Sequence, residues 1–252
     1  MTTIENVGVI GAGVMGAGIA AQVSNAGLPV VLLDIVPEGA SNRNAIAEGA
    51  VQKMLKVNPA PFMHRRNARR ITTGNIEDHL NRLADCDLII EAVVERLEVK
   101  RELLGRVAAA ASASAVLSTN TSGLSITAMA QGLPEATRGR FLGIHFFNPP
   151  RQMRLVELIP GADTDPQVVD RMRRFLEEDL GKGVVEARDT PNFIANRLGV
   201  FALMQALHGM AAGGLEGETV DAVTGTLLGR PRTATLRLCD LIGLDILVHV
   251  AD

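Results

Sequence analysis

The chain contains no tryptophan and no tyrosine among its 252 residues, so phenylalanine, with seven copies, is its only large aromatic side chain. Proteins that bind nucleic-acid bases often stack them on aromatic rings. The formal net charge of −3 also provides no general excess of positive charge for binding phosphates. These two absences argue against a nucleic-acid partner.

Cysteine and long apolar runs are also scarce. Cys86 and Cys239 are far apart in the sequence and neither is near a histidine. They fit neither a disulfide framework nor a metal site, so we expect no metal and a cytoplasmic location. The most apolar stretch, 199–215, is interrupted by Gln205 and His208 and falls short of the ~20 residues of a membrane helix. The sequence therefore predicts no membrane span, and it predicts no signal peptide because the first strand begins almost at once.

A glycine-rich segment carries the strongest positive signal. It lies between an apolar run at 7–10 and an alanine-rich helical stretch that reaches Gly27, and it reads Gly11-Ala12-Gly13-Val14-Met15-Gly16. In such a segment the first glycine permits a tight turn and the second lets the backbone approach a pyrophosphate. The third lets the helix pack closely on the strand. The helix N-terminus then presents unpaired N–H groups to the phosphates.

A second apolar run at 30–33 ends in Asp34. This acid follows the glycines by about 20 residues, where a carboxylate can accept hydrogen bonds from the ribose hydroxyls of a dinucleotide. Strand, glycine turn, helix, strand and acid therefore occur in the order that a dinucleotide site requires. We predict a dinucleotide-binding domain.

The pattern of apolar runs predicts the fold class. Strand-like runs recur at 7–10, 30–33, 88–90, 115–117 and 141–144, mostly with helical patterns between them. This alternation predicts an α/β domain with a Rossmann-type, doubly wound, mostly parallel sheet. Helices are expected at 38–56 and 165–180, and further strands at 154–160 and 183–187.

The strand pattern stops near Thr190, and helical patterns follow at 191–212, 217–228 and 234–252. We therefore expect a Rossmann-type domain at 1–188 and a smaller all-helical domain at 189–252. The apolar pattern still runs at 248–252 without a helix cap. A helix cut there would leave Ile246, Leu247 and Val250 partly uncovered, so we expect further chain or a partner subunit to cover them.

Three polar clusters follow predicted strands, at 91–95, 118–122 and 145–150. Serine, threonine and asparagine after a strand also form turns and helix caps, and a single histidine is more often structural than catalytic. However, His145 occurs together with the glycine turn, the hydroxyl of Ser122 and the downstream carboxylate of Glu157. A hydride-transfer enzyme needs a group that removes the alcohol proton, and a carboxylate on the second ring nitrogen fixes the imidazole tautomer.

A basic cluster comprises Arg65, Arg66, Arg69 and Arg70, with Lys53 and Lys56 nearby in the sequence. It fits the solvated face of a helix. It also fits a docking surface for the phosphates of a large acyl carrier.

On these motifs the chain resembles the 3-hydroxyacyl-CoA dehydrogenase family of fatty-acid β-oxidation, including versions fused to enoyl-CoA hydratase. The resemblance covers almost the whole chain through five ordered segments, 9–20, 90–95, 118–122, 145–149 and 189–197. The family more often has glycine at the position of Asn192, and usually a second serine where this chain has Gly123. The segment between Asp34 and Ile71 lacks the lysine-rich helical tail of some members, which leaves the CoA contacts open.

The resemblance implies NAD-dependent oxidation of an L-3-hydroxyacyl-CoA to a 3-ketoacyl-CoA by a homodimer. It implies that His145 is the general base with Glu157 as its partner, and that Ser122 and Asn196 hold the substrate oxygen. It further implies that NAD contacts Gly11, Ala12, Gly13, Val14, Met15, Gly16, Asp34, Ala92, Glu95, Lys100, Asn120 and Asn148. Without the family, Lys100 could equally be a solvated helix residue.

Two other functions are compatible with a similar glycine turn. A short-chain hydroxy-acid dehydrogenase would use a catalytic lysine on the first helix of the second domain, but 191–204 contains Arg197 and no lysine. A crystallin-like or regulatory relative would bind NAD without turnover. The presence of both His145 and Glu157 argues against this second alternative.

Overall fold

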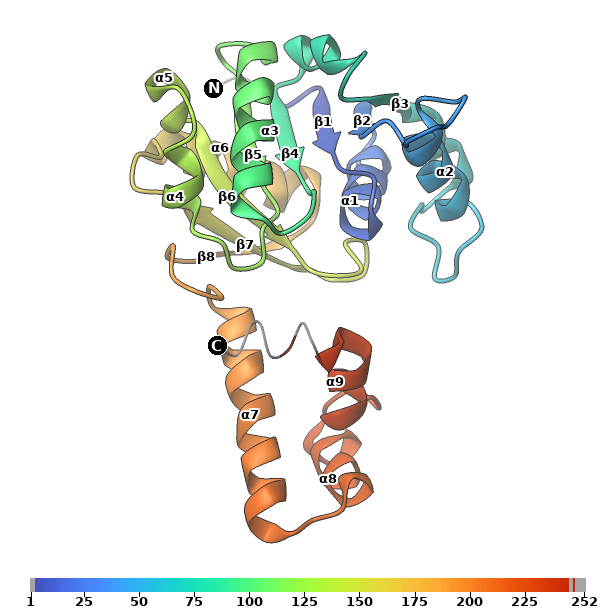
Figure 1. The fold of residues 1–252 in the computed structure, drawn as a ribbon, viewed down its shortest axis with the longest axis vertical. Helices are drawn as coiled ribbons and strands as arrows, with labels where there is room; N and C mark the ends of the chain where they lie inside the picture. Colours follow the sequence, from blue (N-terminus) through green and yellow to red (C-terminus); the bar gives the residue numbers. More distant parts are fainter. Residues whose placement is uncertain (1–2, 245–246, 248–252) are drawn as a thin grey trace. The chain divides into compact units, whose positions relative to one another are not determined.

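The computed structural model describes residues 3–244 and Leu247. It divides into two compact units, Met1–Thr190 and Pro191–Asp252, which are treated separately below. The first unit is built around one eight-stranded sheet, and the second is made of helices (Figure 1). None of the described helices is long and apolar enough to cross a membrane.

The sheet has the strand order β3-β2-β1-β4-β5-β6-β7-β8. Its first six positions are parallel, whereas β7 runs antiparallel to β6 and β8 runs parallel to β7. This is the doubly wound arrangement predicted from the sequence, with the order of strands reversing between β1 and β4. The strands are β1 (Val7–Ile10), β2 (Val30–Asp34), β3 (Ile71–Asn75), β4 (Leu88–Glu91), β5 (Val116–Thr119), β6 (Phe141–Phe146), β7 (Leu155–Pro160) and β8 (Gly183–Glu186).

Strand β3 is absent from the sequence prediction. Its residues Ile-Thr-Thr-Gly-Asn include one large apolar side chain, because β3 forms an edge of the sheet and pairs only with β2. An edge strand that buries little apolar surface leaves no continuous apolar run to detect.

Helices cover both faces of the sheet. The helices α1 (Val14–Asn25), α2 (Ala45–Met54) and α6 (Pro166–Arg174) share one hydrophobic core with alternate residues of the strands. The helices α3 (Leu97–Ala110) and α4 (Ile126–Ala130), green in Figure 1, lie in front of the strands. Short helical segments complete the unit at η1 (Arg65–Arg70), η2 (Leu80–Asp85), α5 (Glu135–Arg138) and η3 (Phe175–Asp179).

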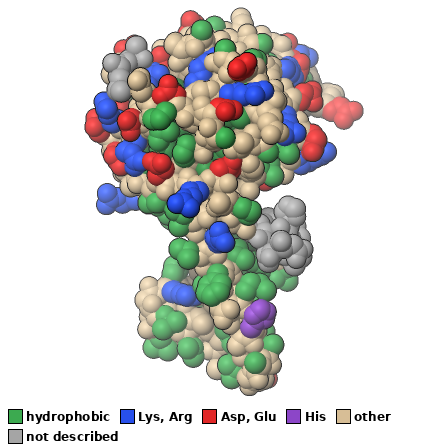
Figure 2. All heavy atoms as spheres, turned by 90° about the vertical axis from the view of Figure 1, so that its left-hand side faces the viewer, with side chains coloured by type: hydrophobic (Ala, Val, Ile, Leu, Met, Phe, Trp, Pro, Cys, Tyr) green, Lys and Arg blue, Asp and Glu red, His purple; other side chains and the backbone are tan. Residues whose placement is uncertain are grey.

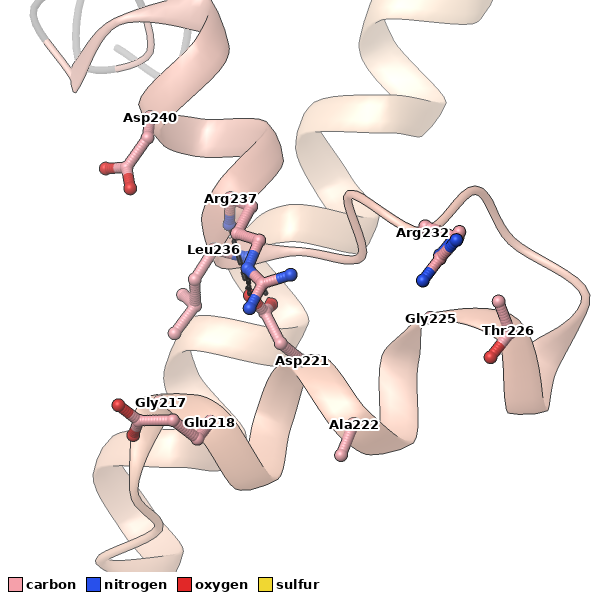
Figure 3. Close-up of a pocket in the computed structure, with 10 residues that line it drawn as sticks. All are labelled: Gly217, Glu218, Asp221, Ala222, Gly225, Thr226, Arg232, Leu236, Arg237 and Asp240. Atoms are coloured by element: carbon pink, nitrogen blue, oxygen red, sulfur yellow. Dashed lines mark hydrogen bonds and ion pairs between the residues drawn. The ribbon is translucent and has the colours of Figure 1, made fainter.

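The second unit contains α7 (Ala195–Gly213), α8 (Gly217–Thr224), η4 (Thr226–Leu228) and α9 (Leu236–Ile242). Asp221 of α8 joins two of these helices. Its carboxylate accepts hydrogen bonds from the main-chain N–H groups of Thr235 at 3.1 Å, Leu236 at 2.7 Å and Arg237 at 3.3 Å, at the start of α9 (Figure 3). These bonds satisfy donors that a helix start otherwise leaves unpaired.

The predicted helix 234–252 is broken at Gly243, although Leu244 and Leu247 beyond it are again helical; the remaining residues from 245 onward lie outside those described. Helix α9 ends at Ile242 because Gly243 adopts a positive φ of 97°, a conformation that breaks a helix. Leu247, which we expected to be partly uncovered, is buried with Leu203 and Cys239. The same expectation for Ile246 and Val250 concerns residues outside those described.

Candidate active site

The glycine turn follows β1, and its three glycines differ in the space around them. Gly11 has φ +99°, and a Cβ built on it would lie 2.5 Å from the carbonyl oxygen of Ala92. A Cβ on Gly16 would lie 1.8 Å from the carbonyl oxygen of Gly11, so helix α1 approaches the turn more closely than any side chain allows. A Cβ on Gly13 would meet no atom within 4 Å. The turn therefore leaves open space beside Gly13, where a pyrophosphate fits against the start of α1.

Asp34 ends β2 and lies against this turn. Its Oδ2 accepts a hydrogen bond from the N–H of Ala12 at 2.5 Å, and its Oδ1 accepts one from the N–H of Ile35 at 2.6 Å. Gly11, Gly13, Asp34 and Ala92 line one pocket at the carboxyl ends of β1, β2 and β4, together with apolar side chains. These residues fit a dinucleotide, with a carboxylate for the ribose and main-chain N–H groups for the phosphates.

His145 and Glu157 face each other across the antiparallel strands β6 and β7, where they form one register pair. The Nδ1 atom of His145 lies 2.8 Å from Oε2 of Glu157, and both side chains are buried. The imidazole ring also packs against the ring of Phe147, with 4.5 Å between the centroids. The carboxylate fixes which imidazole nitrogen carries a proton, because an ionised carboxylate can only accept a hydrogen bond.

Asn120 links the cluster after β5 to the strand that carries His145. Its amide oxygen accepts a hydrogen bond from the main-chain N–H of Phe146 at 2.9 Å. Asn120 is 9% exposed. The structure therefore joins the ends of β5 and β6 through this side chain.

A charged network, buried at Glu91 and Lys100 and exposed at Glu95, holds the cluster that contains Ser122. The ammonium of Lys100 lies 2.7 Å from Glu91 Oε1 and 3.2 Å from Glu95 Oε2. Glu95 Oε1 in turn accepts hydrogen bonds from the main-chain N–H of Ser122 at 2.7 Å and from the hydroxyl of Thr121 at 2.5 Å. Pairing of this kind offsets the hydration that buried charges lose.

Lys100 is 1% exposed, so the alternative of a solvated helix residue is wrong. Glu91 is fully buried at the end of β4, and it also accepts hydrogen bonds from the N–H of Val93 at 2.6 Å and the hydroxyl of Thr119 at 2.7 Å. The network therefore fixes the loops after β4 and β5 to each other.

Asn148 belongs to the turn between β6 and β7. It lines a largely apolar groove together with Gly13, Val14, Pro149 and Pro150. The groove continues along α2 to Lys53 and the segment 57–61. Asp34 is not among the residues that line this groove.

Asp189 connects the end of the first unit to helix α4. Its carboxylate accepts hydrogen bonds from the N–H groups of Ile126 and Thr127, each at 2.8 Å, and from the hydroxyl of Ser125 at 2.9 Å. Burial alone would raise the pKa of Asp189, but these hydrogen bonds outweigh burial and hold the pKa below its usual value of 3.8. Helix α4 begins shortly after Ser122, so the hydrogen bonds to Asp189 fix the start of this helix close to Ser122.

Asn196 lies in the first turn of α7 in the second unit. Just before it, Asn192 has φ 62° and Phe193 has φ 46°. Asparagine is among the residues that adopt this left-handed region most readily after glycine, which explains why it can replace the family's glycine at position 192.

Sequence reasoning did not assign Glu91, Asp189 or Lys182 to the site. Glu91 had a detectable signal, because a carboxylate at the end of a buried apolar strand requires a partner. Lys182, between Gly181 and Gly183, belongs to no periodic pattern, and its partners are carbonyl groups about thirty residues earlier in the chain.

Comparison with known proteins decides the family. A sequence profile described as "3-hydroxyacyl-CoA dehydrogenase, NAD binding domain" matches residues 6–190, and one for the C-terminal domain of the same family matches residues 193–252. The chain belongs to the 3-hydroxyacyl-CoA dehydrogenase family. It is accordingly an NAD-dependent oxidoreductase, and NAD is its cofactor.

Alignments with individual members of this family extend over most of the chain. It is 48% identical over 248 residues to a probable 3-hydroxyacyl-CoA dehydrogenase of Deinococcus radiodurans, covering 98% of this chain and 72% of that protein. It is 44% identical to a probable 3-hydroxyacyl-CoA dehydrogenase of Bacillus subtilis, covering 98% of this chain but only 33% of that longer protein. A solved structure of (S)-3-hydroxybutyryl-CoA dehydrogenase from Ralstonia eutropha is 30% identical with a TM-score of 0.82, covering 98% of this chain and 86% of that one.

Proposed function

We propose that the protein oxidises an L-3-hydroxyacyl-CoA to the 3-ketoacyl-CoA, as in fatty-acid β-oxidation, with His145 as the general base. The observation that carries this proposal is the buried His145–Glu157 pair at the same sheet edge as the glycine turn. NAD, when bound at that turn, supplies the hydride acceptor. The protein itself must bind the substrate, orient it and remove its hydroxyl proton.

His145 performs the proton transfer at Nε2, because Glu157 holds the Nδ1 side of the ring. With Nδ1 protonated towards the carboxylate, Nε2 is the basic nitrogen that takes the substrate's hydroxyl proton. The buried carboxylate then stabilises the imidazolium that forms. In the reverse direction the imidazolium returns the proton to the ketone oxygen.

Ser122 orients the substrate oxygen in this proposal, and the role that the resemblance implies for Asn196 stays a prediction. The network of Glu91, Lys100 and Glu95 keeps the Ser122 segment in place through the bond from the Ser122 N–H to Glu95. Lys100 and Glu95 thereby contribute to the site, and the other expected NAD contacts lie along the same sheet edge. Positioning of this kind contributes much of the rate enhancement of an enzyme.

The acyl-CoA substrate lies in the part of the groove lined by Lys53, Val57 and Pro150, beyond Gly13 and Asn148, which this proposal assigns to NAD. Its walls are mostly apolar, which suits an extended pantetheine and acyl arm. Lys53 and Arg151 supply cations along the groove, where a guanidinium or an ammonium pairs well with the phosphates of CoA.

A second copy of the chain covers the apolar surface of the helical unit. Leu198, Phe201, Leu227 and Leu241 are each more than 60% exposed, and Figure 2 shows hydrophobic side chains on the surface of this unit. Burying each such side chain gains about 1.5–3 kcal/mol. Light scattering tests this homodimer: a mass near twice 26.7 kDa supports it, and a stable monomer contradicts it.

The reaction is tested by mixing the protein with acetoacetyl-CoA and NADH and following absorbance at the NADH band. We expect NADH to be consumed only when acetoacetyl-CoA is present. Binding of NADH without consumption would show a non-catalytic relative, and it would overturn the proposal. Consumption of NADH with short free 3-keto acids but not with the CoA thioester would also overturn it.

A further inference from the structure

The side chain of Lys182 is buried, and main-chain carbonyl groups hold its ammonium. It is 6% exposed, and Nζ donates hydrogen bonds to the carbonyl oxygens of Pro150 and of Met153, the latter at 2.8 Å. Burial lowers the pKa of Lys182. Within the described residues no ion pair with a carboxylate is found for it, in contrast to Lys100.

Burying a cation is costly unless strong hydrogen bonds replace its water. Hydrogen bonds from a charged group stabilise more than neutral ones. The ammonium of Lys182 donates such charged hydrogen bonds to two carbonyl groups of one turn. The turn is closed by hydrogen bonds from the N–H groups of Gln152 and Met153 to the carbonyl oxygen of Pro149, at 3.1 and 3.0 Å.

The other sides of the turn are also fixed. Pro150 packs on helix α1 so closely that a Cβ built on Gly18 would lie 2.8 Å from Pro150 Cδ. The guanidinium of Arg151 donates to the carbonyl oxygen of Ala60 at 2.5 Å. The turn therefore lies between Lys182, helix α1 and the segment 57–61, and it forms one wall of the groove beside Gly13.

We propose that Lys182 is a positioning residue whose ammonium holds the turn 148–153 against helix α1 and so sets the width of the groove that receives the acyl-CoA. The proposal rests on the proposed function, because it assigns the groove to that substrate. The same turn joins the strand of His145 to the strand of Glu157, so its position also fixes where a substrate in the groove meets the imidazole. Lys182 itself contacts neither substrate nor cofactor.

The variant Lys182→Met removes the ammonium and retains the length of the side chain. We expect the KM for acetoacetyl-CoA to rise about 10-fold, the loss expected when a charged hydrogen-bond donor is removed from the wall of a site. The Kd for NADH should rise less than this KM, because Asn148 is the one NAD contact that the turn carries and the glycine turn is untouched. NADH fluorescence measures this Kd directly.

Arg188→Met provides a matched control, because Arg188 is exposed, lies just beyond β8 and also loses one positive charge. It should leave both constants unchanged. Hydrogen exchange completes the comparison: the amides of 148–154 should exchange faster in Lys182→Met and those of α3 should not. Should Lys182→Met fail to fold, Lys182→Gln, which retains two N–H donors, takes its place.

A folded variant with unchanged acetoacetyl-CoA KM overturns the inference about Lys182. A parallel loss of NADH binding together with faster exchange across the whole unit also overturns it, because that result indicates general destabilisation. If the wild-type protein consumes no NADH with acetoacetyl-CoA, the proposed function fails instead. The exchange difference in 148–154 would then still show whether Lys182 holds the turn.

A second pair of variants moves the same turn without touching Lys182. Gly18→Ala should push Pro150 outward and raise the same KM, while alanine remains favourable within a helix. Gly105→Ala in α3 is the matched control, since a Cβ there meets no atom within 4 Å. Equal KM values for both alanine variants would show that the turn does not control the groove.

Discussion

His145 and Glu157 are direct partners across β6 and β7, with 2.8 Å between Nδ1 and Oε2. The two residues are twelve positions apart, and the turn between their strands folds them into one antiparallel register. A strand pair positions side chains more rigidly than loops do, because every neighbouring backbone group is hydrogen bonded. The fold therefore presents the imidazole in one orientation before any substrate arrives.

The position of Asp34 predicts a preference for NAD over NADP. Its carboxylate lies against the glycine turn, and the next side chain, Ile35, brings no compensating charge. A 2′-phosphate on the ribose would meet this like charge, so we expect kcat/KM to favour NAD by at least ~10-fold. Steady-state rates with both cofactors decide this point. Equal values, or a preference for NADP, would show that Asp34 does not lie at the ribose.

The glycine turn provides a pair of variants with opposite expected effects. Gly13→Ala places a methyl group in open space, so the fold should keep its stability while NADH affinity falls at least ~10-fold. Gly16→Ala places its methyl group 1.8 Å from a carbonyl oxygen and should destabilise the fold by about 1–3 kcal/mol. Thermal unfolding and NADH titration separate the two effects. Wild-type NADH affinity in Gly13→Ala would contradict the assigned phosphate site.

Asp189 predicts a specific dependence of stability on pH. Its pKa in the fold lies below 3.8, so its carboxylate stabilises the fold above that pH. The contribution is lost as the pH falls through 3.8 and then through the lower value in the fold. Asp189→Asn should therefore cost about 1–2 kcal/mol at pH 7 and progressively less below pH ~4.

Urea unfolding of the two proteins at several pH values measures this difference. Asp170→Asn, which removes an exposed carboxylate from α6, is the control and should show little loss at either pH. A cost for Asp189→Asn that stays constant down to pH 3 would show that the carboxylate's charge is not what stabilises the start of α4.

Much of the first unit could be predicted because its strands are buried on both faces. Strands β1, β4 and β5 are fully buried and therefore read as short apolar runs. Polar residues that follow such runs must gather at one sheet edge, which explains why His145, Ser122 and Asp34 could be chosen from the sequence. Strand β3 could not be predicted, since an edge strand of this composition has no apolar pattern.

Contacts that depend on tertiary structure escaped prediction for a different reason. The partners of Lys182 are main-chain carbonyls, which every residue carries, so no sequence pattern marks them. The break in the predicted helix 234–252 was missed, because apolar periodicity continues past Gly243 although the positive φ of this glycine interrupts the helix. The burial of Leu247 also depends on Leu203 and Cys239, which are distant in sequence.

The turnover of His145→Gln with acetoacetyl-CoA and NADH tests the central claim most directly. Glutamine keeps the size and polarity of the side chain but cannot exchange the proton, so kcat should fall at least ~100-fold while the Kd for NADH stays within about 2-fold. His208→Gln, at an exposed position of α7, is the control and should keep full turnover. If His145→Gln keeps most of the wild-type kcat, His145 is not the general base and the proposed mechanism is wrong.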